Sequence, residues 1–146
     1  MLYVVTGPPA AGKSTLIESR AKPRDIVIDL DRITRALTGP GAPQWNHEPI
    51  ASKVAMRARY AAIDEAVKHL ESTDVYLIHT MPTDTWLARY RRLGAEIITV
   101  DPGEQVVRER VRAMRSSAME RVVTRWYRSY GGGKSRPATA QSSREW

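Results

Sequence analysis

The sequence contains no cysteine among its 146 residues. This absence excludes disulfides, thiolate metal sites and cysteine nucleophiles, and it is typical of proteins in a reducing cytoplasm. No apolar run approaches the roughly 20 residues that cross a bilayer, and the apolar run at the start is too short for a secretory leader. We therefore expect a cytoplasmic protein (host cytoplasm for a viral chain) with no membrane partner.

Acidic residues are scarce toward the C-terminal end of the chain. The net charge is +7, and residues 1–85 are balanced, with ten Lys/Arg and ten Asp/Glu. Residues 104–146 instead hold ten Lys/Arg against four Glu. A basic segment on a neutral body indicates an anionic partner, either nucleotide phosphates or a nucleic-acid backbone. A solubilising face followed by a basic tail would give the same pattern, so charge alone leaves both readings open.

Short β-branched runs alternate with longer helical patterns, in a length that suits one domain. We expect strands over residues 2–6, 26–29, 74–79 and 97–100, and helices over 13–20, 32–37, 49–71, 83–93, 103–115 and 118–130. This alternation predicts an α/β three-layer sandwich, with a parallel sheet of about four strands and helices on both faces. Functional residues should then lie at the carboxyl ends of the strands.

The buried stripe of the helix over 49–71 is expected to hold its regularly spaced apolar side chains, which are Val54, Ala58, Ala61, Ala62, Ala66 and Leu70.

The segment over 131–146 begins with three glycines and is rich in small polar residues. It is predicted to be a flexible basic tail behind a domain over 1–130.

A glycine-rich loop separates the first strand from the first helix. Gly7, Gly12, Lys13 and Ser14 occupy every fixed position of the Walker A pattern, Gly-x-x-x-x-Gly-Lys-Ser/Thr. The glycines let backbone N–H groups turn toward phosphate oxygens, Lys13 can reach the β- and γ-phosphates, and Ser14 can bind Mg²⁺. The loop predicts a nucleoside triphosphate site, for ATP or GTP, made by Gly7, Pro8, Pro9, Ala10, Ala11, Gly12, Lys13, Ser14 and Thr15.

Two carboxylates, Asp29 and Asp31, follow the second strand. A phosphotransferase needs a carboxylate near the γ-phosphate to take the proton from an attacking hydroxyl. Asp31 is predicted to be this base, although it could also cap the helix over 32–37, and the two roles can coexist. Asp29 is the alternative base, and its expected role is to bind Mg²⁺ through water.

The stretch over 7–15, together with Asp29-Leu30-Asp31-Arg32-Ile33-Thr34-Arg35, resembles the kinase domain of phage-type 5′-hydroxyl polynucleotide kinases. The resemblance spans about residues 1–130 and implies a P-loop kinase domain with a helical lid over about 103–116. It also implies that Asp31 is the general base and that Arg35 holds the substrate phosphate.

This sequence departs from the family in two places. Arg35 lies four residues after Asp31, where the family spacing is three. The family usually has Asp-Thr-Asn after the third strand, whereas this chain has His79-Thr80-Met81. His79 either contacts the acceptor or makes only local hydrogen bonds.

The helix over 103–115 carries arginines beside an apolar stripe. Arg108, Arg112 and Arg115 share one helical face, next to Val107 and Val111. By resemblance to the family's lid helix, Arg108 and Arg112 are expected to touch the transferred phosphate, as an arginine finger supplied by the chain itself. A solvated basic face is the alternative reading.

Several other side chains admit a binding role and a structural role. Trp126, Tyr127 and Tyr130 could stack on bases, but their helical spacing favours the core. Trp45 and His47, in the loop rich in Pro and Gly, are better candidates for stacking on an acceptor base. Asp101 ends the fourth strand, and the Pro-Gly that follows it favours a turn role.

These residues together predict Mg²⁺-dependent transfer of the ATP γ-phosphoryl group to a hydroxyl, with a polynucleotide 5′ end as the leading acceptor. The partner would then be single-stranded or end-exposed nucleic acid. A nucleoside, nucleotide or small metabolite is the alternative acceptor. A nucleotide-binding regulatory module with little or no transfer is a third possibility. The choice between ATP and GTP and the oligomeric state do not follow from the sequence.

Overall fold

A computed structural model describes residues 1–114, 116–130 and 140–141 of the chain. Its sheet is parallel throughout, with the strand order β2-β3-β1-β4-β5. The strands are β1 (Leu2–Thr6), β2 (Ile26–Ile28), β3 (Val75–Ile78), β4 (Glu96–Val100) and β5 (Ala140–Gln141). The predicted parallel sheet of four strands is confirmed, and β5 adds a two-residue strand beside β4. Apart from β5, the predicted flexible tail lies outside the described residues.

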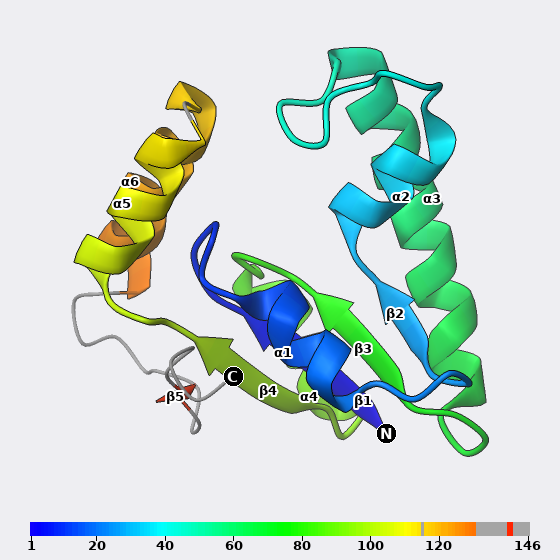
Figure 1. Ribbon diagram of the computed structural model, residues 1–146. Helices are drawn as coiled ribbons and strands as arrows, with labels where there is room; N and C mark the ends of the chain where they lie inside the picture. Colours follow the sequence, from blue (N-terminus) through cyan, green and yellow to red (C-terminus); the bar gives the residue numbers. More distant parts are fainter. Residues whose placement is uncertain (115, 131–139, 142–146) are drawn as a thin grey trace.

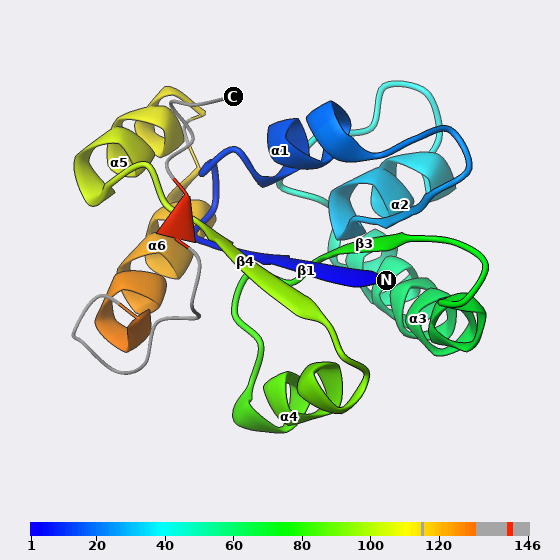
Figure 2. The ribbon, with the colours of Figure 1, turned by 90° about the horizontal axis from the view of Figure 1, so that it is seen from below.

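The helices lie close to their predicted positions. They are α1 (Lys13–Arg20), α2 (Leu30–Leu37), α3 (Pro49–Ala66), the 3-10 helix η1 (Val67–His69), α4 (Asp84–Arg92), α5 (Glu104–Ala113) and α6 (Ser117–Tyr130). Figure 2 shows α1 on one face of the sheet and α4 on the other. In the described part of the chain, no helix is both long and apolar enough to span a membrane.

The strand side chains divide between two cores because successive residues of a strand point to opposite faces. Leu2 and Val4 of β1 pack with residues of α3 and α4, whereas Val5 packs against Leu16 and Ile17 of α1. Both faces of the central strands are therefore buried. This explains why these strands read as continuous apolar runs rather than as alternating ones.

The buried stripe of α3 agrees with the predicted one at its C-terminal end and differs at its N-terminal end. As predicted, Ala66 is buried, and Ala62 and Leu70 pack against the core. Val54 is instead 51% exposed, and Ala55, Arg59 and Ile63 are the buried residues that precede Ala66. There the two stripes are offset by about one residue, and both keep helical spacing. Packing against β2 and the neighbouring core selects the stripe that includes an arginine.

Helix α6 is fixed to the loops after β3 and β4 by its aromatic side chains. Trp126 Nε1 donates to the Thr80 carbonyl oxygen at 3.1 Å, and Tyr130 Oη donates to that of Pro82 at 2.9 Å. Tyr127 Oη donates to Asp101 Oδ1 at 2.7 Å. Trp126 is 3% exposed, in agreement with the core role favoured for it. These bonds place α5 and α6 on one side of the glycine-rich loop, opposite α2 and α3 (Figure 1).

Candidate active site

The loop between β1 and α1 has the backbone of a phosphate-binding turn. Gly7 has φ +143°, and a Cβ there would overlap with the carbonyl oxygen of Val100. Gly12, the N-cap of α1, has φ +102°, and Ala10 has φ +59°. Gly7 is therefore required both by its dihedral angle and by the close approach of β4. The turn opens directly onto the N-terminus of α1, where unpaired N–H groups favour an anion.

Lys13 reaches back across this loop. Its Nζ donates to the carbonyl oxygens of Gly7 at 2.9 Å and Pro8 at 2.6 Å, and the residue is 8% exposed. Burial lowers the pKa of Lys13 from 10.5 to about 8, although the nearby charges of Asp29 and Asp31 favour the ammonium form. The site thus holds a desolvated ammonium close to two carboxylates, where an anionic ligand would stabilise it.

Asp29 lies at the end of β2 and is almost fully buried. Its Oδ1 accepts from the backbone N–H of Asp31 at 3.0 Å, and its Oδ2 accepts from Ser14 Oγ at 3.3 Å. Asp29, rather than Asp31, is therefore the N-cap of α2, which begins two residues earlier than predicted. A carboxylate and a hydroxyl side by side next to a phosphate loop are oxygen ligands of the kind that Mg²⁺ prefers. Ser14 and Asp29 therefore fit the predicted metal role.

No group of three or more His, Cys, Asp or Glu side chains suited to a metal ion occurs among the described residues. Beside a triphosphate, Mg²⁺ is commonly bound through one or two protein oxygens, with phosphates and waters supplying the rest.

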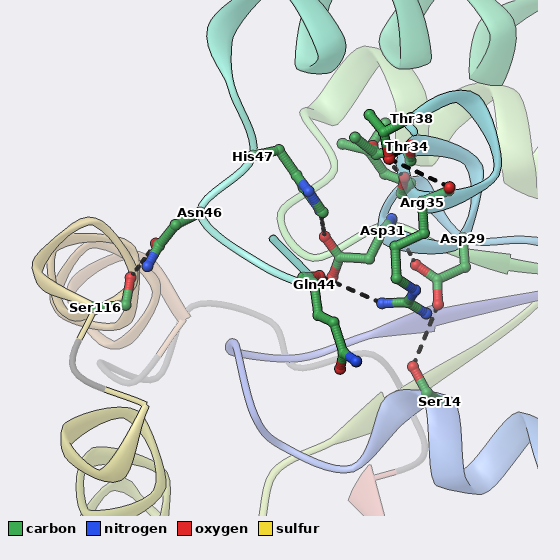
Figure 3. A network of polar contacts seen from close by, with 11 residues as sticks. Ser14, Asp29, Asp31, Thr34, Arg35, Thr38, Gln44, Asn46, His47 and Ser116 are labelled. Atoms are coloured by element: carbon green, nitrogen blue, oxygen red, sulfur yellow. Dashed lines mark hydrogen bonds and ion pairs between the residues drawn. The ribbon is translucent and has the colours of Figure 1, made fainter. Parts of the chain in front are cut away.

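Asp31 stands in the first turn of α2 with a free carboxylate edge. Its side chain is 54% exposed, and its Oδ1 is 2.9 Å from His47 Nε2 (Figure 3). His47 was predicted to stack on a base, whereas here it is a hydrogen-bond partner of the candidate base. The contact joins residues 16 positions apart, and nothing in the local sequence pattern indicates it.

The two predicted acceptor residues have different surroundings. Arg35 Nη1 donates to the carbonyl oxygen of Gln44 at 3.4 Å and lines the cavity beside the loop. His79 Nδ1 is 2.7 Å from Tyr90 Oη, and its ring packs edge-on against Trp86 and Tyr90. Burial, followed by the charge of Arg59, lowers the pKa of His79 to about 4, so it is neutral at pH 7. His79 makes the local contacts foreseen for it while also lining the cavity.

Arg59 is a site residue that the sequence analysis missed. It comes from α3, is 5% exposed, and donates from Nη2 to the carbonyl oxygen of Ile78 at 3.0 Å. Burial lowers the pKa of its guanidinium, and no carboxylate of the described residues forms an ion pair with it. A buried arginine that lines the cavity without an acidic partner is suited to bind an anion. An arginine four residues from both Ala55 and Ile63, in an otherwise apolar stripe, was the available signal.

The arginines of the lid are placed in a different register from the predicted one. Arg110 Nη1 donates to the carbonyl oxygen of Ala10 at 3.0 Å and lines the phosphate-loop cavity. Arg108 instead pairs with Glu104 at 2.8 Å, and both Arg108 and Arg112 line a separate cavity between α5 and α6. In this structure Arg110 is therefore the arginine of α5 that contacts the loop, whereas Arg108 and Arg112 lie away from it. The predicted and observed arginines differ because α5 carries arginines on both sides of its buried stripe, Val107 and Val111, and the sequence does not show which side faces the loop.

The central cavity has a volume of about 680 Å³. One side is the phosphate loop over residues 9–15, and the other is formed by α2, α3 and the ends of β2 and β3. The wall away from the loop includes the exposed rings of Trp45 and Tyr60 and the partly buried thioethers of Met56 and Met81. The volume falls within the usual range of small-molecule sites. The cavity therefore has a polar phosphate end and a more apolar end.

The segment between α2 and α3 supplies Gln44 and Trp45 to the lining of this cavity. Asn46 Oδ1 accepts from Ser116 Oγ at 2.7 Å, which joins this segment to the junction of α5 and α6 (Figure 3). Arg35 and His47 hold the same segment to α2 through the contacts already described. The predicted acceptor side and the lid are thus in direct contact.

This sheet order, the phosphate-binding turn and the helical lid define the α/β fold of P-loop kinases. No protein-family model matches the chain, and no curated protein matches it. Its fold is similar to the crystal structure of a Chloroflexus aurantiacus protein named "putative kinase". The TM-score is 0.61 at 16% identity, and the match covers 97% of this chain and 88% of that one.

The tunicamycin resistance protein of Deinococcus radiodurans was also matched, with a TM-score of 0.48 at 18% identity, over 98% of this chain and 85% of that one. At 16% identity the likeness to the Chloroflexus aurantiacus protein shows the fold alone. The match to the Deinococcus radiodurans protein has a TM-score below 0.5 and supports no conclusion.

Proposed function

We propose that this protein transfers the γ-phosphoryl group of ATP to a hydroxyl acceptor. The observation that carries the proposal is the convergence of Lys13, Asp29 and Asp31 on one cavity, with the Lys13 ammonium held inside the loop. Phosphoryl transfer depends mainly on positioning and on charge stabilisation. An ammonium, a buried carboxylate and an accessible carboxylate at one sheet edge supply both.

Each residue takes a role that follows from its contacts. Lys13 and Arg110 lie where they can neutralise charge on the phosphates, and Asp31 accepts the proton of the attacking hydroxyl. His47 holds the Asp31 carboxylate in place through its 2.9 Å contact. Ser14 and Asp29 would hold Mg²⁺, which would supply further neutralisation of phosphate charge.

For the acceptor, we propose a polynucleotide 5′-hydroxyl. Trp45 and Tyr60 are partly exposed on the cavity wall, and their aromatic rings suit stacking with a base. Arg35 and Arg59 line the same side and suit the phosphates of a nucleic acid.

A nucleoside or other small acceptor is favoured by a separate observation. The Asn46–Ser116 contact ties the segment that carries Gln44 and Trp45 to the junction of α5 and α6, beside the cavity. Such a tie leaves less room for a chain that continues beyond the first nucleotide. Salt discriminates between the two acceptors, because a polymer held by several arginines loses affinity steeply as salt rises and a small acceptor does not.

The test is incubation with γ-labelled ATP and a panel of 5′-hydroxyl DNA, 5′-hydroxyl RNA and nucleosides. Label is expected on an oligonucleotide 5′ end. Label on nucleosides alone would replace the polymer with the small acceptor. Nucleotide binding without transfer to any acceptor would contradict the kinase function and favour a regulatory module.

Arg59→Met is expected to slow transfer by about 10²-fold, because the variant removes a positive charge beside the reacting groups. Stability should stay level or rise, since an unpaired buried guanidinium is replaced by an apolar side chain of similar length. Turnover and the thermal midpoint are the two measurements. Arg57→Met, at an exposed position of the same helix, is the matched control. Normal turnover together with lower stability in Arg59→Met would show that Arg59 has only a structural role, through its hydrogen bond to Ile78.

His47→Ala is expected to lower kcat by about tenfold, with nucleotide affinity unchanged, because the Asp31 carboxylate loses its positioning partner. His47→Gln places an amide donor near the position of Nε2 and should restore most of the rate. Equal loss of rate in both variants would show that the contact with Asp31 is not what matters.

A further inference from the structure

The lid contains a second cavity, on the side of α5 that faces away from the phosphate loop. It lies between α5 and α6, and its volume is about 620 Å³. Five arginines line it: Arg108 and Arg112 from α5, and Arg121, Arg125 and Arg128 from α6. We call this feature the arginine groove. None of its lining residues lines the central cavity.

The positive charge of the groove is largely uncompensated. Glu104 pairs with Arg108 at 2.8 Å, and Glu120 is the acidic residue that lines the groove itself. None of the other four arginines forms an ion pair with a carboxylate of the described residues. All four are exposed to solvent. One helix pair thus concentrates much of the basic excess seen in the sequence.

The arginines stand on a rigid base. Val107, Val111 and Val123 are fully buried between the two helices and hold them together. Arg121, Arg125 and Arg128 follow one another at four and three residues along α6, so they share a face. The array is therefore held by packing that does not depend on the arginines themselves.

The lining identifies the chemistry of the ligand. Besides arginine, the groove offers the hydroxyls of Ser117 and Thr124, and no aromatic side chain of the described residues lines it. Guanidinium and hydroxyl groups bind phosphate oxygens. Recognition of base edges and stacking on bases would require amide or aromatic side chains. Five guanidinium groups exceed what a single phosphate neutralises, so a row of phosphates fits better. A membrane surface fits less well, because the site is concave and its apolar residues, Val111 and Val123, are buried.

We propose that the arginine groove binds the phosphodiester backbone of a nucleic acid, without sequence preference. The site lies outside the catalytic cavity and does not depend on phosphoryl transfer. It would hold a strand against the lid while another part of that strand, or of another molecule, approaches the central cavity. The basic excess of the C-terminal segment would then reflect a binding surface.

The test is fluorescence anisotropy of a labelled single strand of mixed sequence, titrated without nucleotide over a range of salt. The variant Arg121→Gln/Arg125→Gln is compared with Arg91→Gln/Arg92→Gln, which removes the same charge from exposed positions of α4. Each lost phosphate contact lowers the slope of log affinity against log salt by about 0.7 for a single strand. The slope for the groove variant should therefore be smaller by about 1.4, which corresponds to about twentyfold weaker binding near 0.1 M salt. The α4 control should change little in slope or affinity.

Two further arms sharpen the result. Arg121→Lys/Arg125→Lys keeps the charge and should retain most of the binding. A blunt duplex should also bind, with a slope that depends on the same two arginines. Equal loss of binding in the groove variant and the α4 control would overturn the proposal, as would absence of strand binding by the unaltered protein. Binding to phosphatidylserine vesicles but not to the strand would replace the nucleic acid with a membrane surface.

This experiment separates the groove from the proposed kinase function. Lys13→Met should bind the strand as the unaltered protein does, since it leaves the lid intact. If the protein binds the strand but labels no 5′ end, the proposal for the groove stands and the polynucleotide acceptor is excluded. If the protein labels 5′ ends and the groove variant binds the strand with unchanged salt dependence, the polynucleotide acceptor stands and the proposal for the groove is wrong.

Discussion

Replacing Lys13 with methionine should abolish transfer and weaken triphosphate binding by at least about 10²-fold. The ammonium is held by the carbonyl oxygens of Gly7 and Pro8, inside the loop that would bind the β- and γ-phosphates. Methionine keeps the length and apolar stem of the side chain and removes only the charge. Calorimetry with ATP and Mg²⁺ measures the first effect, and label transfer measures the second.

Lys53→Met, at an exposed position of α3, is the matched control and should bind nucleotide normally. Unchanged ATP affinity in Lys13→Met would contradict the phosphate-loop assignment, on which the proposed kinase function depends.

The lowered pKa of Lys13 also gives a pH dependence with a definite sign. The folded protein loses this proton near pH 8, whereas the unfolded chain keeps it to about 10.5. Within that window the unfolded chain binds more protons, so the Lys13 contribution makes the free energy of unfolding rise with pH. The affinity for ATP should instead fall as the pH rises. The triphosphate needs the ammonium form, so the Kd should rise by up to about tenfold per pH unit above 8.

Both pH effects should disappear in Lys13→Met, which has no proton to lose at this position. Thermal melts and calorimetry at pH 7 and at pH 9 provide the measurements. ATP affinity that stays constant across this interval in the unaltered protein would show that the bound ammonium is not the titrating group.

Asp31→Asn is expected to leave ATP binding intact and to lower transfer by about 10²- to 10⁴-fold. The amide has almost the same shape and can still contact His47, but it cannot accept the proton of the attacking hydroxyl. Label transfer at saturating ATP is the measurement, with calorimetry to verify that nucleotide still binds.

Asp64→Asn is the control for Asp31→Asn, because Asp64 is an exposed carboxylate that pairs with Arg89 on the outer surface. Its loss should have little effect, since exposed pairs contribute little to stability. Normal turnover in Asp31→Asn would exclude Asp31 as the base and leave Asp29 to be tested in the same way.

The sequence was most informative where local chemistry leaves few alternatives. The loop over 7–15 could be placed because Gly7 and Gly12 both need a positive φ, and because Lys13 and Ser14 follow at fixed positions. The strands could be placed because each is a short apolar run between helices. The predicted carboxyl edge of the sheet does collect Asp29, Asp31 and His79 around one cavity.

The sequence was least informative about which face of a helix meets which neighbour. In α3, the stripe through Val54 and the stripe through Ala55 and Arg59 have the same period, so periodicity could not choose between them. In α5, arginines flank both sides of the buried stripe. Contact between this helix and Ala10 brings Arg110, rather than Arg108 or Arg112, to the loop.

What the sequence by itself determined is the order of the elements and the chemistry of the loop, because both depend on residues adjacent in the chain. The tertiary structure decided the Asp31–His47 contact, the burial of Arg59 and the register of the lid. Each of these joins segments that only packing brings together, and a rotation of about 100° per residue turns any one-position error in a helix into a different face.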